Sequence, residues 1–438
     1  MVGVNALASV APPAPSPTQT QAESGTLGTL ASVRARGAPR GRVTLLGPAF
    51  VIAVAFVDPG NVATNFAAGA ATGYQLVWVV AAANLMAMLV QYLSAKLGLA
   101  TGRSLPELCR DRAPAWLVVP MWVQAELVAM ATDLAEFVGA ALGLSLLFGM
   151  PIRAAAPVTA AIAFAVLAAQ RRGHRRFELA IGALLCLVTI GFAYDLLAAG
   201  HQCLAPLALG AVPRLPDGSG ALLAVGIVGA TLMPHVVYLH SALTRQRVRA
   251  ADEDDRRRLL RYLRLDCGVG LGLAGLVNVG MLCLAVALFT RGPGPLDAIT
   301  AAHDDLRRTV GGAAALGFAV ALLASGVSSA SVGTYAGQIV MQGFLRCGIP
   351  LTVRRAITML PALVVLCLGL PVTQTLLASQ VVLCFGIPFA LVPLVALTRR
   401  RELMGTMVNR RVTTLAGALI CLLVTALNAY LLATTFGG

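Results

Sequence analysis

Four residues near the start of the first apolar stretch combine a negative charge with a helix breaker. Asp58-Pro59-Gly60-Asn61 lies between the runs 43–57 and 62–90, neither of which contains a charged side chain. A carboxylate at the centre of a membrane helix costs about 2.5–3.5 kcal/mol on insertion scales, so function is the default expectation. Proline removes a backbone donor, and the break exposes carbonyl oxygens such as that of Ala55. The four residues predict a cation site at mid-membrane depth.

A second helix breaker, Met233-Pro234-His235, stands in another apolar segment. Met233 offers a thioether sulfur, and Pro234 frees the carbonyl of Ala230. Oxygen ligands alone, from Asp58 and Asn61, would suit Mg²⁺ or Ca²⁺. A soft sulfur ligand shifts the preference to Mn²⁺, Fe²⁺, Co²⁺ or Cd²⁺. The alternative for the methionine is simple packing.

Three carboxylates follow one another in a third apolar segment. Glu126, Asp133 and Glu136 are separated by seven and three residues, which places them on one face of a helix. Lines of carboxylates inside membrane proteins usually relay protons. The alternative is a set of buried salt bridges that holds helices together.

Histidines and arginines extend this candidate proton pathway. His235 adjoins the second break and His240 follows a little over one turn later. Histidine titrates nearest to neutral pH, which suits a relay between carboxylates. Arg354 and Arg355, at the start of a later apolar segment, are expected to carry the pathway onward.

The elements that must position these residues are membrane-spanning helices. The chain has 438 residues, of which 58% are hydrophobic and 12% charged, as in polytopic membrane proteins. A span needs about 20 apolar residues. Hydropathy predicts eleven spans, near 44–71, 76–98, 115–147, 153–170, 178–198, 220–243, 266–290, 312–343, 354–371, 376–397 and 412–435.

The basic residues set the expected orientation. The net charge is +14, yet 28 of the 33 Lys and Arg residues fall in alternate loops if the N-terminus is cytoplasmic. This bias follows the positive-inside rule and places the C-terminus outside. It argues against nucleic acid as a partner and indicates a multi-pass protein of the plasma membrane within the lipid bilayer.

The two breaks lie in the first and sixth predicted spans, 175 residues apart. Proline-interrupted spans at matching places indicate two repeats of five helices. Five is odd, so the repeats at about 44–198 and 220–397 are inverted, with an extra helix near 412–435. This all-α architecture is the LeuT-like fold. Residues 41–435 are expected to form one transmembrane domain after a disordered tail, 1–40, rich in Ala, Pro, Ser and Thr.

Several motifs make the chain resemble the Nramp family of proton-coupled divalent metal transporters, in its bacterial manganese branch. They are DPGN at 58–61, ATNFAAGAATGYQL at 63–76, TDLAEFVGAALGL at 132–144, MPHVVYLHS at 233–241, GTYAGQIVMQGF at 333–344 and SQVVLCFGIPFALVPL at 379–394. DPGN alone is a weak match, but DPGN with MPH in two broken spans is specific. Gln342 departs from the family, which often has Glu there.

The resemblance implies a metal bound by Asp58, Asn61 and Met233, with the carbonyls of Ala55 and Ala230 as ligands in alternate states. It adds Gln380 in the tenth span as a further ligand. It implies a proton route through Asp133, Glu136, Glu126, His235, Arg354 and Arg355, and polar support from Gln91 and Asn278.

The expected function is import of divalent transition metals, Mn²⁺ foremost, with protons and by alternating access. No resident cofactor is expected, because the metal is cargo. An amino-acid transporter of the same fold is the main alternative, although its site usually has glycines at the break. An enzyme is disfavoured because no hydrolase or phosphate-loop motif occurs, and a sensor because no sizeable soluble domain remains.

Two charged stretches each have two possible interpretations. The run at 252–258, four acidic residues followed by three arginines, reads as a solvated cytoplasmic loop, with a metal sensor as the alternative. His303-Asp304-Asp305, in an outside loop, is expected to be solvated, with cation collection as the alternative.

Overall fold

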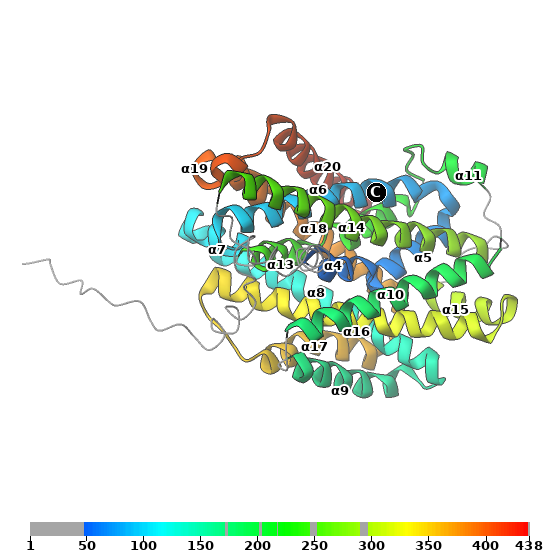
Figure 1. Ribbon diagram of the computed structural model, residues 1–438. Coiled ribbons are helices and arrows are strands. Elements are labelled where there is room, and N and C mark those ends of the chain that lie inside the picture. Colours follow the sequence, from blue (N-terminus) through cyan, green and yellow to red (C-terminus); the bar gives the residue numbers. More distant parts are fainter. Residues whose placement is uncertain are drawn as a thin grey trace, which may run out of the picture.

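The computed structural model describes residues 48–170, 174–200, 204–216, 218–245, 252–289 and 297–436. Within these ranges the secondary structure is helical, and Figure 1 shows long helices running side by side through the molecule. The tail expected at residues 1–40 lies outside the described residues.

Helices stand at every position that hydropathy predicts. They are α4 (Pro48–Ala53) with α5 (Pro59–Thr72), α6 (Val77–Thr101), α8 (Ala115–Phe148), α9 (Ile152–Gln170), α10 (His174–Ala198), α12 (Gly220–Leu232) with α13 (Pro234–Thr244), α14 (Glu253–Leu288), α16 (Gly312–Leu345), α17 (Leu351–Leu368), α18 (Val372–Thr398) and α20 (Arg411–Phe436). The all-helical fold is therefore confirmed, and each of the eleven predicted spans coincides with a helix among the described residues.

Length and apolarity agree with membrane crossing. Among the described residues, eight segments are long and apolar enough to span a membrane, and the segment Val51–Thr101 is long enough for two crossings. The apolar parts of α9 and α10, Ile152–Val166 and Gly182–Ala198, are shorter than these segments. Large apolar side chains on the outside of the bundle, such as Leu415 and Leu422 on α20, are exposed and suit contact with lipid.

Short elements cap the two ends of the bundle. In Figure 1, α7 (Leu105–Arg112) and α19 (Arg401–Met404) lie at one end, and α11 (Leu204–Leu209) and α15 (Ala298–Thr309) lie at the other. The remaining pieces are short 3-10 turns: η1 (Ala55–Val57), η2 (Gly73–Leu76) and η3 (Gly405–Met407). His303 lies within α15, so the expected outside loop is helical there.

Both predicted breaks occur, each with proline at the first position of the following helix. Asp58 has an extended backbone between η1 and α5, and Met233 leaves the helical conformation between α12 and α13. Because proline has no N–H, Pro59 and Pro234 cannot bond the carbonyls four residues before them, those of Ala55 and Ala230.

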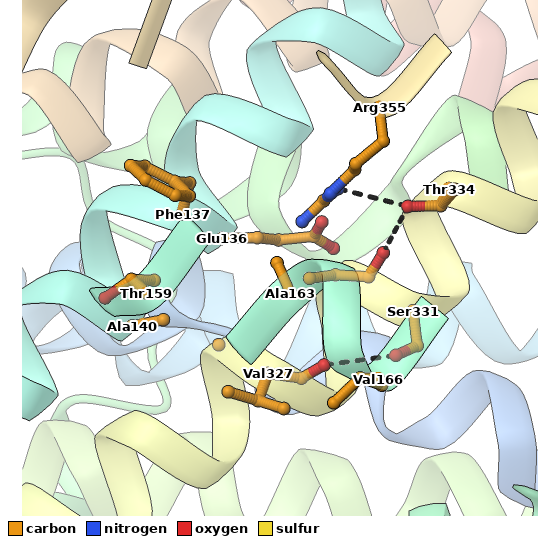
Figure 2. Close-up of a pocket in the computed structure, with 12 residues that line it drawn as sticks. Glu136, Phe137, Ala140, Thr159, Ala163, Val166, Val327, Ser331, Thr334 and Arg355 are labelled. Atoms are coloured by element: carbon orange, nitrogen blue, oxygen red, sulfur yellow. Dashed lines mark hydrogen bonds between the residues drawn. The ribbon is translucent and has the colours of Figure 1, made fainter. Parts of the chain in front are cut away.

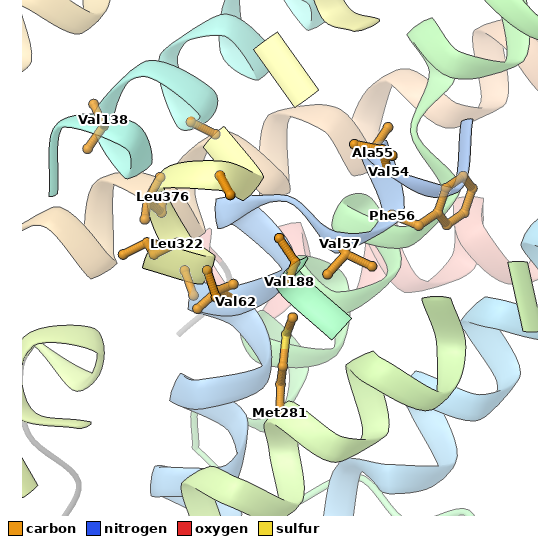
Figure 3. Packing of buried hydrophobic residues seen from close by; sticks show 14 of the residues in the cluster. Val54, Ala55, Phe56, Val57, Val62, Val138, Val188, Met281, Leu322 and Leu376 are labelled. Atoms are coloured by element: carbon orange, nitrogen blue, oxygen red, sulfur yellow. The ribbon is translucent and has the colours of Figure 1, made fainter. Parts of the chain in front are cut away.

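Apolar packing holds the first break in the middle of the bundle. Val54, Phe56 and Val57 belong to a buried cluster that also contains Met281 of α14 and Leu322 of α16, and Figure 3 shows these side chains around the broken segment. The break is therefore positioned by side chains from several distant helices.

Glycine permits the closest approaches between helices. A Cβ at Gly139 of α8 would overlap the ring of Pro59, and one at Gly229 of α12 would overlap the carbonyl of Gln380 in α18. The first break thus sits directly on α8, and the second on α18.

The acidic run is part of a helix and not a loop. The seventh span was expected from residue 266, but α14 begins at Glu253. The Asp252 side chain caps it by accepting a hydrogen bond from the Asp255 N–H at 2.7 Å. Acidic residues in a first turn complement the helix dipole, so structure accounts for their position.

Candidate functional site

Asp58 organises the first break through its side chain. Its Oδ1 accepts hydrogen bonds from the backbone N–H of Asn61 and from Asn61 Nδ2, both at 2.7 Å. Both side chains are buried, with 2% and 1% of their surfaces exposed. A buried carboxylate is held by charge-assisted hydrogen bonds here, as an N-cap of α5.

The two breaks meet at the Asn61 amide. Asn61 Nδ2 donates to the carbonyl oxygen of Ala230 at 3.0 Å, and that carbonyl is the one that Pro234 leaves without its helical donor. Met233 is three residues further on and is 1% exposed. A carboxylate, an amide and a freed carbonyl are therefore brought to one buried place.

The tenth span adds a second amide to this place. Gln380 is fully buried, and a Cβ at Gly60 would lie 2.5 Å from its Cδ, so its side chain rests against the first break. Gln380 Nε2 donates to Ser379 Oγ at 3.0 Å, while Oε1 has no hydrogen-bond partner among the described residues. A buried oxygen without a donor is costly, which suits an atom that receives a cation.

Neutral side chains hold the two backbone carbonyls that directly precede the first break. Asn278 of α14 donates to the carbonyl of Phe56 at 2.9 Å and accepts from Asn65 at 2.9 Å. Ser325 of α16 donates to the carbonyl of Val57 at 2.6 Å. The structure thus places Asn278 in support of the break. Ser325 was not identified from the sequence, where it is one of several serines in a small-residue helix.

The candidate proton pathway is a ladder of ion pairs between α8 and α17. Arg355 Nη1 lies 2.7 Å from Asp133 Oδ1, and Arg354 reaches both oxygens of Glu126 at 3.0 and 2.7 Å. Both arginines are buried. The expected stripe of carboxylates exists, and two of its three members carry an arginine partner.

Glu136 differs from the other two carboxylates. It is buried, and its Oε2 has no hydrogen-bond partner among the described residues. It lines a cavity of about 20 Å³ with Arg355, Thr334 and Ser331. Figure 2 shows the Glu136 carboxylate beside Arg355, which hydrogen-bonds to Thr334 at 3.1 Å. A cavity of this size has room for one water molecule, for which Glu136, Arg355 and the two hydroxyls are the polar partners.

The two histidines occupy different surroundings. His235 Nδ1 lies 3.2 Å from the hydroxyl of Thr132, which is the neighbour of Asp133 in α8. His240 Nδ1 lies 3.1 Å from Gln91 Oε1 in α6. The structure therefore brings His235 to the carboxylate helix, whereas His240 and Gln91 pair with each other on α13 and α6.

The donor set suits a transported ion more than a stored one. Among the described residues, no group of three or more His, Cys, Asp or Glu side chains could hold a metal ion. Any metal between the breaks would instead meet one carboxylate, amide and carbonyl oxygens, and one sulfur. Such mixed, weakly charged ligands favour later divalent ions over Mg²⁺ or Ca²⁺.

The fold and the paired breaks define a membrane transporter of the LeuT-like class, with its site between the two interrupted helices. Residues 49–434 match the family described as natural resistance-associated macrophage protein-like, and the chain belongs to this Nramp family.

Two relatives extend over nearly the whole chain. The divalent metal cation transporter MntH of Deinococcus radiodurans is 49% identical over 413 residues, which cover 93% of this chain and 94% of that protein. The MntH of Chromohalobacter salexigens is 50% identical over 396 residues, covering 90% and 91%.

Solved structures agree with this assignment. A manganese transporter from Eremococcus coleocola superimposes with a TM-score of 0.80 at 30% identity, covering 90% of this chain and 87% of that one. The nucleobase-cation-symport transporter Mhp1 shares the fold, with a TM-score of 0.55 at 16% identity over 89% of this chain and 93% of its own.

Proposed function

We propose that this chain imports divalent transition-metal ions, Mn²⁺ foremost and also Fe²⁺, Co²⁺ and Cd²⁺, together with protons. The observation that carries the proposal is the Asn61 amide, which joins Asp58 of the first break to the Ala230 carbonyl of the second at 3.0 Å. The names of the MntH relatives and of the manganese transporter structure support the same cargo.

The metal replaces most of its water with ligands from three spans. Asp58 supplies the negative charge, Met233 the sulfur, and Asn61 and Gln380 amide oxygens. The carbonyls of Ala55 and Ala230 complete the set in alternate states, because proline leaves both without a helical donor. All of these donors except Asp58 are neutral, which keeps binding moderate enough for release.

Protons travel beside the metal, along α8. The charged groups that act on Glu136 are Asp133, Arg355 and Asp58. The Glu136 carboxylate therefore interacts both with the metal site, through Asp58, and with the ion-pair ladder, through Asp133 and Arg355. A proton from the Asp58 region passes to Glu136 and Asp133, and the arginine pairs with Asp133 and Glu126 carry the charge further.

Transport follows from rocking of the spans that contain the two breaks against the others. The membrane potential drives entry of each positive charge by about 2.3 kcal/mol per 100 mV. The protein is placed in the plasma membrane with its N-terminus cytoplasmic and its C-terminus outside, on the distribution of its basic residues.

Metal-dependent acidification in proteoliposomes, measured with a panel of divalent ions, tests this function. We expect Mn²⁺ uptake with acidification of the lumen, and little uptake of Mg²⁺ or Ca²⁺. Labelled amino acids in parallel vesicles test the alternative of an amino-acid transporter. Uptake of an amino acid without metal flux would overturn the proposal.

A further inference from the structure

A cavity distant from the breaks lies between the start of α14 and the α19–η3 turn. It measures about 390 Å³, and its polar lining includes Arg256, Arg257, Arg401 and Thr406. In Figure 1, α19 lies at the end of the bundle that also carries α7. The metal pathway proposed above uses none of these residues.

The cavity carries a net positive charge. Glu253, its acidic member, accepts a hydrogen bond from Thr406 at 3.1 Å and pairs with Arg256 at 3.6 Å. Arg257 and Arg401 form no ion pair with any described residue, although both line the cavity. Two guanidinium groups with unused donors facing one cavity suit a phosphate, which they can bind in a forked geometry.

The rest of the lining is apolar. Leu260, Met407 and Val408 contribute to the same cavity, and Met407 is buried. A ligand that fits this lining has an anionic head and an apolar part. An inorganic anion would contact the basic lining residues and leave the apolar ones without a partner.

Further along α14, a different face of the helix from the one that lines the cavity is apolar and exposed. Leu265, Val269 and Leu276 recur on one side of this helix and are 58%, 56% and 73% exposed. Arg261, one turn before Leu265, is exposed on the same side. Arginines therefore border the apolar stripe where the headgroups of a bilayer leaflet would lie.

We propose that this cavity binds the phosphate headgroup of an anionic phospholipid. Arg257 and Arg401 hold the phosphate, Thr406 offers a hydroxyl, and the upper part of an acyl chain lies along Leu260 and Met407. The lipid would join α14 to the α19–η3 turn.

Native mass spectrometry of the full chain in detergent tests the site, with dioleoylphosphatidylglycerol and dioleoylphosphatidylcholine as probes. The wild type is expected to retain phosphatidylglycerol preferentially. R257Q/R401Q should lose affinity for it by about tenfold or more, since each basic residue near an anionic surface contributes roughly 1 kcal/mol. R257K/R401K should keep most of the preference because the charge remains.

The matched control is R258Q/R400Q, which removes the same charge from neighbouring exposed residues outside the cavity. An equal loss in this control would overturn the site in favour of general surface charge. Equal retention of the two lipids would also overturn it. Displacement of the lipid by inorganic phosphate at equal concentration would assign the cavity to a soluble anion instead. Thermal unfolding of each variant in detergent establishes that it is folded.

Discussion

Asn61 Nδ2 lies 3.0 Å from the carbonyl oxygen of Ala230 and 2.7 Å from Asp58 Oδ1. One amide thus connects two interrupted helices through residues that are 169 positions apart in the chain. A residue in this position responds to movement of either broken helix, and its neighbours are the donors proposed for the metal.

Replacing Asp58 with Asn removes the one carboxylate among the proposed ligands. We expect Mn²⁺ uptake to fall by at least about tenfold, the scale seen when metal sites lose a supporting group. The N-cap survives, because asparagine accepts the Asn61 N–H as aspartate does. Radiolabelled Mn²⁺ uptake measures the loss of transport, and the unfolding temperature measures whether the N-cap of α5 is kept. Unchanged uptake would contradict the ligand role.

Replacing Met233 with Ala removes the sulfur ligand. We expect discrimination against Ca²⁺ and Mg²⁺ to weaken, while Mn²⁺ uptake persists in part, because the remaining donors are oxygens. The measurement is competition of Ca²⁺ against Mn²⁺ in proteoliposome flux. Selectivity identical to that of the wild type would show that the methionine only packs.

Replacing Asp133 with Asn removes the acid that pairs with Arg355 at 2.7 Å. We expect proton flux to fall more than metal flux, because asparagine cannot carry the proton. Breaking a buried pair also costs about 3–5 kcal/mol, so the unfolding temperature should drop. The double variant D133N/R355Q, which removes both members of the ion pair, is the control for stability. If D133N keeps normal proton and metal flux, Asp133 is no part of the relay.

Replacing Gly139 with Ala tests how closely the first break must approach α8. The new methyl would overlap Pro59, and the shifts needed to accommodate it lower the stability of the folded state by about 1–3 kcal/mol. We expect a lower unfolding temperature and slower Mn²⁺ uptake. Gly268 in α14 has no neighbour within 4 Å of an added Cβ, so G268A is the matched control and should be neutral or stabilising. Equal behaviour of the two variants would refute the close contact.

Glu107, outside the membrane spans, gives the protein a predictable response to acid. Burial opposes ionisation, but Arg245 at 2.6 Å and the Ser104 hydrogen bonds outweigh it and lower the pKa of the Glu107 carboxyl below 4.5. A lowered carboxyl pKa stabilises the folded state above the unfolded pKa, and this contribution is lost as pH falls through the folded value.

The E107Q variant keeps the capping box of α7 and loses the charge. Wild type should therefore unfold at a higher temperature than E107Q at pH 7, with the difference shrinking below about pH 4.5. Thermal unfolding of both proteins across this range measures it. A difference that stays constant down to low pH would exclude the ionised Glu107 as its source.

Local patterns in the sequence determined the helices, the breaks and the kinds of donor available. Apolar runs of span length produce helices because the bilayer leaves backbone groups no other partner, and Pro59 and Pro234 end a helix wherever it packs. The carboxylate face of α8 also follows from spacing alone, since Glu126, Asp133 and Glu136 share one helix.

Only the tertiary structure decided which groups meet. The donation from Asn61 to Ala230, the pairing of Arg355 with Asp133, and the hydrogen bond from Ser325 to the Val57 carbonyl each join segments more than 100 residues apart. Asp266 likewise accepts from the Ala49 N–H at 3.0 Å, across 217 residues. Hydropathy is a property of neighbours in the chain, whereas these contacts depend on how glycine-faced helices pack, which no local pattern contains.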